Sequence, residues 1–107
     1  MPTLTDRESR RGLRLLLNLS GRDSRGAPFA ERGQTVNVSG GGLCFEAVRR
    51  VPVGSRVDLR IQVPPALRRH FAGKAVYAVR AVVCRLEPVE GGATYRIGAR
   101  FIGELDA

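Results

Sequence analysis

The stretch RVDLRIQV, residues 56–63, decides the fold class. Apolar and polar residues alternate strictly along it, and the apolar ones are Val57, Leu59, Ile61 and Val63. Successive side chains of a β-strand point to opposite faces, so this stretch has one apolar and one polar face. It therefore predicts a half-buried antiparallel strand.

Two other stretches repeat the pattern, LRLLLNLS at 13–20 and YRIGARF at 95–101. Their apolar faces consist of Leu13, Leu15, Leu17 and Leu19, and of Tyr95, Ile97, Ala99 and Phe101. Further strands are predicted at 33–39, 42–48 and 74–87. The last of these is apolar on both faces over part of its length, which indicates a central or strongly bent strand.

Glycine and proline mark the connections at 20–29, 51–54 and 87–92. Residues 64–73 are interpreted mainly as a loop with room for one short helical turn. Six strands without a long helix predict an all-β domain, either a closed barrel or a sandwich. We assign residues 13–107 to this single domain and residues 1–12 to an arginine-rich arm that is flexible until something orders it.

The composition is that of one globular domain, with 107 residues of which 43% are hydrophobic. No apolar run is long enough to cross a membrane, and no secretory signal is evident, so we expect a cytoplasmic protein. Cys44 and Cys84 lie within apolar runs, which favours two buried thiols over a disulfide.

Positive charge is the strongest global feature, with 18 basic and 10 acidic residues and a net charge of +8. Every basic residue except Lys74 is an arginine. Guanidinium groups make forked hydrogen bonds to phosphates and guanine edges, so a polyanionic partner is indicated. GC-rich codons also favour arginine, without any binding role.

Signatures of catalysis are missing from the sequence. The one histidine, His70, follows Arg68 and Arg69 and is expected to be solvated. No HExxH, CxxC or nucleophile-elbow motif is present. The acidic residues Asp23, Glu31, Glu46 and Asp58 stand singly on predicted turns or polar faces. We therefore expect no enzyme activity, no metal site and no cofactor.

The stretch NVSGGG, residues 37–42, is the first candidate binding element. Alternation predicts that Val36 and Val38 pack inward while Asn37 and Ser39 share the opposite face. An amide and a hydroxyl both donate and accept hydrogen bonds. The glycines allow positive φ and the close approach of a ligand or another chain. Taken alone, a hairpin turn capped by Asn and Ser explains the stretch slightly better.

The second candidate element is RESRRGLR, residues 7–14, which contains Arg7, Arg10, Arg11 and Arg14. In an extended chain Arg10 and Arg14 project to the same side, where two guanidinium groups can clamp one anion. The RxxxR pattern also occurs at Arg7/Arg11, Arg56/Arg60 and Arg96/Arg100. In a chain so rich in arginine, the pattern alone is a weak indicator.

The order of the two elements is more specific than either alone. An RxxxR at the entrance to the first strand, followed by [D/N]xSxxG at the end of the next strand, resembles the PilZ domain. YRIGARFIGEL at 95–105 is similar to the last strand of that family. The resemblance covers about residues 7–103, nearly the whole chain.

The resemblance implies a six-stranded antiparallel β-barrel that binds the bacterial second messenger cyclic di-GMP. It implies that Arg10 and Arg14 grip the guanines and phosphates of the ligand. Asn37 and Ser39 would hydrogen-bond to the ligand from the barrel surface, and Gly42 would hold the turn open. Binding would wrap the arm over the barrel, which is a disorder-to-order switch.

Two departures from the family pattern affect these expectations. Many members carry an arginine directly before the first arginine of the motif. In this chain that position is Ser9, and an arginine, Arg11, instead follows Arg10. Arg7/Arg11 is therefore an alternative register. The chain stops at Ala107, so we expect the C-terminal helix of many relatives to be short or absent. A partner, a second copy in a homodimer or another domain would then cover one open end of the barrel.

The favoured function is a non-catalytic cyclic di-GMP receptor with a downstream protein partner in motility, biofilm or exopolysaccharide machinery. One alternative is a small basic barrel that binds RNA or single-stranded DNA. The scarcity of aromatic residues argues against it, because few stacking platforms remain once the core is filled. The other alternative is a PilZ-like protein-interaction module that binds no ligand.

Overall fold

The alternating stretches form strands whose apolar faces meet in one core. The computed structural model describes residues 13–105. In β1 (Leu16–Arg22) the side chains of Leu17 and Leu19 are buried, and in β4 (Arg56–Gln62) Leu59 and Ile61 are buried. The two strands pair antiparallel, with Leu17 opposite Ile61. The sequence predicted this inward-facing set correctly.

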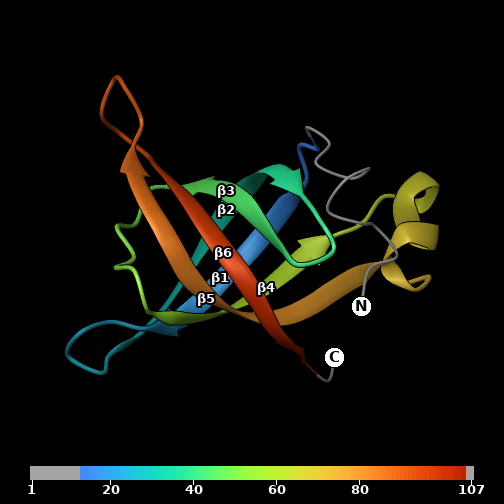
Figure 1. The fold of residues 1–107 in the computed structure, drawn as a ribbon, viewed down its shortest axis with the longest axis horizontal. Coiled ribbons are helices and arrows are strands. Elements are labelled where there is room, and N and C mark those ends of the chain that lie inside the picture. Colours follow the sequence, from blue (N-terminus) through green and yellow to red (C-terminus); the bar gives the residue numbers. More distant parts are fainter. Residues whose placement is uncertain (1–12, 106–107) are drawn as a thin grey trace.

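The strands close into a barrel in the order β1-β2-β3-β6-β5-β4 (Figure 1). The other four strands are β2 (Pro28–Val38), β3 (Gly42–Ala47), β5 (Val76–Pro88) and β6 (Tyr95–Glu104). Every neighbouring pair is antiparallel, including β4 with β1. Closure leaves no long strand edge exposed. The prediction of an all-β, six-stranded antiparallel barrel is confirmed, and the sandwich is excluded.

Strand β5 is the strongly bent one. Three consecutive residues, Tyr77, Ala78 and Val79, are buried, which strict alternation does not allow. The pairing of β5 with β6 shifts register between Arg80 and Ala81, and again further along the strand. Such bulges bend a strand and increase its twist. The apolar residues on both faces of this stretch therefore belong to a strand that curves around the barrel.

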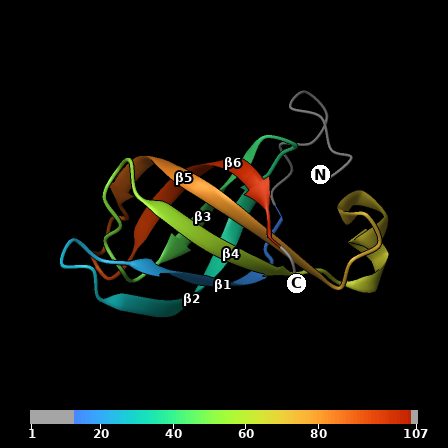
Figure 2. The same cartoon turned by 90° about the horizontal axis from the view of Figure 1, so that it is seen from below.

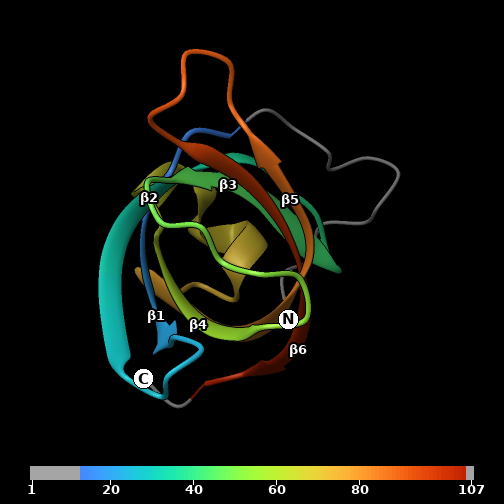
Figure 3. The same cartoon turned by 90° about the vertical axis from the view of Figure 1, so that its left-hand side faces the viewer.

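Residues 64–73 correct the prediction of a loop, because Pro65–Phe71 form a 3₁₀ helix, η1. Proline at its start fixes φ in the helical range, and Ala72, with φ of 57°, ends it. Phe71 is fully buried against Tyr77, with the ring centroids 5.6 Å apart. The helix lies between β4 and β5 at one end of the barrel, which Figure 2 shows from below. Figure 3 looks along the barrel and shows η1 behind its opening.

Strand β2 begins earlier than predicted, at Pro28 rather than residue 33. The predicted connection at 20–29 is therefore shorter, with Ser20 to Arg22 in β1. The Asp23 carboxylate organises the remaining turn, since its Oδ1 accepts hydrogen bonds from the N–H groups of Arg25 and Ala27, both at 2.9 Å. A side chain that satisfies local backbone donors makes a short turn sufficient.

The expectation of two buried thiols is wrong. Cys44 is half-buried and Cys84 is exposed. Cys44 alternates with the buried Leu43 and Phe45, so it faces outward despite its apolar neighbours. Cys84 lies where β5 shifts register against β6. An apolar run in a barrel strand therefore does not by itself place every member inside.

Only Leu105 is described after β6, so no helix follows that strand within residues 13–105. In the same part of the chain, no helix is long and apolar enough to span a membrane. The predicted arm at 1–12, which includes Arg7, Arg10 and Arg11, lies outside the described residues.

The hydroxyl of Tyr77 yields a test of the core. It is buried, and no described residue forms a hydrogen bond with it. Burial raises the pKa of Tyr77 above its ordinary value of 10.0, because the charged phenolate would lose its hydration. An unfolded tyrosine ionises more readily, so this stabilising difference is fully present below about pH 10 and is lost as the pH rises further.

We expect Tyr77→Phe to keep the wild-type free energy of unfolding at pH 7 to within about 1 kcal/mol, because no intramolecular hydrogen bond is lost. Between about pH 9 and pH 11 the variant should lose less stability than wild type. Urea unfolding across this range measures both quantities. An alkaline loss as large in the variant as in wild type would contradict this account of Tyr77.

Candidate functional site

A register shift in β2 decides which of its side chains face outward. Thr35 pairs with Phe45, but the next paired residue is Asn37, opposite Cys44. Val36 is therefore the extra residue of a bulge. Thr35 and Val38 are buried, whereas Val36 and Asn37 are half-buried. The outward position of Asn37 is confirmed, and the predicted inward position of Val36 is wrong because Thr35 takes that place.

The turn after β2 is held by Ser39 and by a close approach of β6. The N–H of Ser39 donates to the carbonyl of Gly42 at 2.8 Å, and its hydroxyl donates to the same oxygen at 3.2 Å. A Cβ added to Gly42 would lie 2.3 Å from the carbonyl oxygen of Ala99. Glycine is needed here for space and not for the positive φ that we expected, since none of the glycines at 40–42 has a positive φ. The interpretation of residues 37–42 as a turn capped by Ser39 agrees with these two hydrogen bonds.

An open groove of about 970 Å³ lies over β2, β3, β6 and β5. The strands β3, β6 and β5 face the viewer in Figure 1. The groove joins the predicted residues Asn37, Ser39 and Gly42 with residues that the prediction did not include. The rest of its lining is Val36, Gly41, Leu43, Cys44, Cys84, Arg85, Glu87, Arg96, Gly98, Ala99 and Arg100.

The floor of the groove is partly bare backbone. One transverse row of residues runs Asn37, Cys44, Gly98 and Arg85 across the four strands. A Cβ on Gly98 would meet the Cβ of Arg85 at 3.3 Å, so Gly98 lets the neighbouring side chains come close. A flat group such as a nucleobase can approach backbone that carries no side chain.

Carboxylates pair with some arginines of the groove and leave another without an ion pair in the described part of the chain. Arg96 donates to Glu46 Oε2 from Nη2 at 2.8 Å and from Nε at 3.3 Å, and this contact raises the pKa of Arg96. Arg85 Nε lies 3.7 Å from a carboxylate oxygen of Glu87. Within residues 13–105, Arg100 has no ion pair and the Asn37 amide has no hydrogen-bond partner. These two groups are available to a ligand.

Arg14, the described arginine of the RxxxR element, lies beside this groove. Its Nη1 is 3.8 Å from Glu46 Oε1, and its side chain is 58% exposed. Because Glu46 also binds Arg96, one carboxylate connects Arg14 to an arginine of the groove lining. The structure thus brings Arg14 to the side of the barrel that carries Asn37, Ser39 and Gly42. Their roles in ligand binding remain predictions.

The sequence did not identify Arg96 and Arg100 as candidates, although both line the groove. They are one of the RxxxR pairs attributed to composition. A separation of four residues places both on one face of a strand, and Gly98 lies midway between them on that face. Cys44 was also missed. Burial raises the pKa of its thiol, and the nearby Arg96 and Arg85 oppose this shift.

Comparison with known proteins identifies related folds. The family model of the PilZ domain matches residues 5–107. Among solved structures, the Bacillus subtilis inhibitor of motility MotI/DgrA is similar with a TM-score of 0.66 and 16% identity, over 91% of this chain and 42% of that chain. MrkH of K. pneumonia in its apo state is similar with a TM-score of 0.58 and 12% identity, over 92% of this chain and 43% of that chain. This chain spans less than half the length of either. No curated protein sequence matches it.

The contact between Gly42 and β6 generates a prediction about stability. We expect Gly42→Ala to lower the free energy of unfolding by about 1–3 kcal/mol, because the new methyl group would overlap the carbonyl of Ala99. Gly103→Ala on β6 is the control, since a Cβ there meets no atom within 4 Å. It should change stability by about 0.5 kcal/mol or less. Equal stabilities of the two variants by urea unfolding would refute the steric role of Gly42.

Proposed function

The chain belongs to the PilZ domain family, and on this basis we propose that it is a non-catalytic receptor for cyclic di-GMP. The observation that supports the proposal best is the groove. It joins Asn37, Ser39 and Gly42 on the barrel surface, and Arg14 is linked to its lining through Glu46, which also binds Arg96. Such an arrangement offers hydrogen-bond donors and positive charge to an anionic nucleotide.

The chemistry of the ligand suits these groups. Cyclic di-GMP has two guanine bases and two phosphates. Arginine makes bidentate hydrogen bonds to guanine O6 and N7 and charge-assisted bonds to phosphate. In our proposal Arg14 and Arg10 supply these contacts, and Arg7 or Arg11 contributes if the alternative register is used. Asn37 and Ser39 hydrogen-bond to the ligand from the barrel, and Gly42 keeps the turn close to β6.

Ligand binding also provides a means of signalling. We propose that the arm at 1–12 wraps over the bound ligand and so changes the exposed surface of the receptor. The new surface then acts on a protein of the motility, biofilm or exopolysaccharide machinery, or on a second copy of the chain. The receptor would work in the cytoplasm. Protection of Arg7, Arg10 and Arg11 from trypsin on ligand addition is the expected sign of ordering.

Binding of RNA or single-stranded DNA is less well supported. Such proteins stack bases on exposed aromatic side chains. The core takes up Phe45, Phe71, Tyr77 and Phe101. Of the remaining two aromatic residues, Phe29 is half-buried with Arg49 above its ring at 4.4 Å, and Tyr95 packs against the core. Positive charge is thus available to a nucleic acid, but stacking surfaces are scarce.

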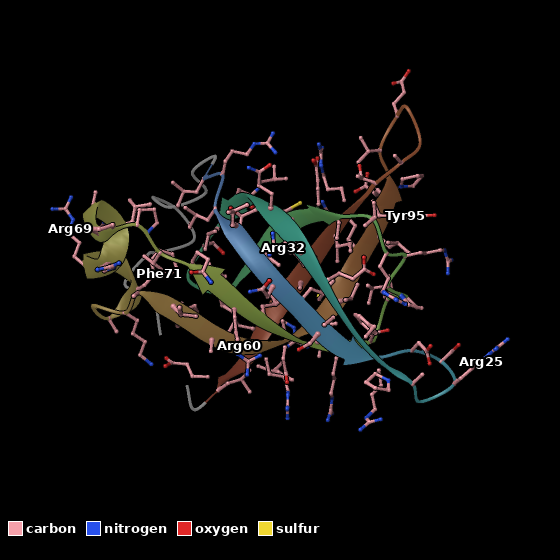
Figure 4. All side chains as sticks on the ribbon, turned by 180° about the vertical axis from the view of Figure 1, so that it is seen from behind. Arg25, Arg32, Arg60, Arg69, Phe71 and Tyr95 are labelled. Carbon is pink, nitrogen blue, oxygen red and sulfur yellow. The ribbon has the colours of Figure 1, made fainter. Side chains whose placement is uncertain are left out.

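Arg14→Ala tests the proposed clamp. We expect it to weaken cyclic di-GMP binding by about tenfold or more, the loss typical of a charge-assisted hydrogen bond. Arg60→Ala is the matched control, since it removes the same charge from an exposed arginine of β4. The opposite side of the barrel, with Arg60 and Arg32 flanking β1, is shown in Figure 4.

Calorimetry at low salt measures the affinity of both variants, and circular dichroism checks that both remain folded. No binding by the wild-type protein would refute the proposed function. Equal affinities of the two variants would show that Arg14 is not part of the clamp.

The free guanidinium of Arg100 leads to a separate prediction. We expect Arg100→Ala to weaken cyclic di-GMP binding by about tenfold, because it removes an uncompensated charge from the groove. Arg85→Ala is the control in the same groove, since it removes the same charge from an arginine that already has a carboxylate oxygen of Glu87 at 3.7 Å. It should weaken binding by about threefold or less. The same loss in both variants would mean that net charge, rather than the free guanidinium of Arg100, determines the affinity.

A further inference from the structure

Thr35 is the one buried polar residue among residues 13–105, and it is fully buried. Its hydroxyl has two partners, both in the segment before β1. Its Oγ1 accepts a hydrogen bond from the N–H of Leu15 at 2.7 Å and donates one to the carbonyl of Leu13. The N–H of Thr35 in turn donates to the carbonyl of Leu15 at 2.8 Å. The hydroxyl and the N–H of Thr35 thus both form hydrogen bonds to the backbone of Leu13 or Leu15.

These contacts flank Arg14 on both sides. Regular pairing of β1 with β2 begins at Leu16, opposite Gln34, so Arg14 lies before the first residue of the β1 strand. The side chain of Thr35 extends the connection to β2 beyond that point. With the carbonyl of Leu13 and the N–H of Leu15 both held, the backbone of Arg14 has little freedom to turn. From this backbone the Arg14 side chain reaches Glu46, with Nη1 3.8 Å from Oε1.

Thr35 also stands at the bulge that orients Asn37. The pairing of β2 with β3 shifts directly after it, so that Asn37 rather than Val36 lies opposite Cys44. Thr35 takes the inward place and its two successors face the groove. A single buried residue thus contacts the segment of one candidate element and lies directly before the bulge of the other.

We propose that Thr35 is a positioning residue of the ligand site, which holds Arg14 and Asn37 in the relative placement that binding needs. The inference rests on the proposed function. Valine has nearly the shape of threonine but lacks the hydroxyl. In its place the N–H of Leu15 and the carbonyl of Leu13 would lose their partners in a buried setting, and the segment would turn to find others. Serine keeps the hydroxyl and loses only a methyl group.

The test compares Thr35→Val with Thr35→Ser. Thr35→Val is expected to weaken cyclic di-GMP binding by about tenfold or more, while Thr35→Ser stays within about threefold of wild type. Val57→Ala is the control for general loss of stability. Val57 is a buried residue of β4, opposite Gly21 and Ala81, and its truncation should leave affinity unchanged while the protein remains folded.

Hydrogen exchange of the ligand-free proteins gives a readout that does not depend on binding. The amide of Leu15 should exchange about tenfold faster or more in Thr35→Val than in Thr35→Ser or Val57→Ala, because it loses its acceptor. Wild-type protein that binds no cyclic di-GMP would overturn both this inference and the proposed function. Wild-type binding together with equal affinities for the valine and serine variants would overturn this inference alone.

Discussion

Closure of the barrel is the constraint on which the rest of the structure depends. Each strand has two hydrogen-bonded neighbours, so inward and outward positions are fixed for all six strands at once. Closing β3 onto β6 brings the carbonyl of Ala99 so near to Gly42 that only a glycine fits. The same pairing places Arg100 directly opposite Gly42. The close contact that completes the barrel thus also puts a free guanidinium beside the glycine-rich turn.

On the outer face of the barrel, some arginines pair with carboxylates and others have no ion pair within residues 13–105. Although the chain is strongly basic, several outward-facing arginines are bound to a carboxylate, as in Arg80 with Asp58 and Arg96 with Glu46. Exposed pairs of this kind contribute little to stability. Their effect is to cancel charge locally, so the positive charge that remains lies on the arginines that have no carboxylate partner among the described residues. Arg100 is one of these, and it lies in the groove.

The period-two pattern predicted the architecture because it is a local property that reports burial directly. Leu17, Leu59 and Phe101 are inside as expected. The pattern failed at the β-bulges, which explains the errors at Val36 and Cys84. It also failed in η1, because a 3₁₀ helix does not alternate with a period of two. The candidate site was only partly predictable for a related reason. Asn37, Ser39 and Gly42 belong to one short motif, whereas Arg96 and Arg100 come beside them only through the pairing of β3 with β6, which no local pattern in the sequence specifies.

The contact between Arg14 and Glu46 bears on how the groove would receive an anion. At 3.8 Å, and with the arginine more than half exposed, it is a weak pair. The contacts of Arg96 with the same carboxylate are shorter, at 2.8 and 3.3 Å, so Glu46 has a partner whether or not Arg14 stays. An incoming phosphate can therefore take Arg14 without leaving a bare carboxylate at the edge of the groove. Thr35 meanwhile fixes the backbone on both sides of Arg14, so that only the side chain must move. Arg14 is therefore held beside Glu46 by a contact that an anion can displace.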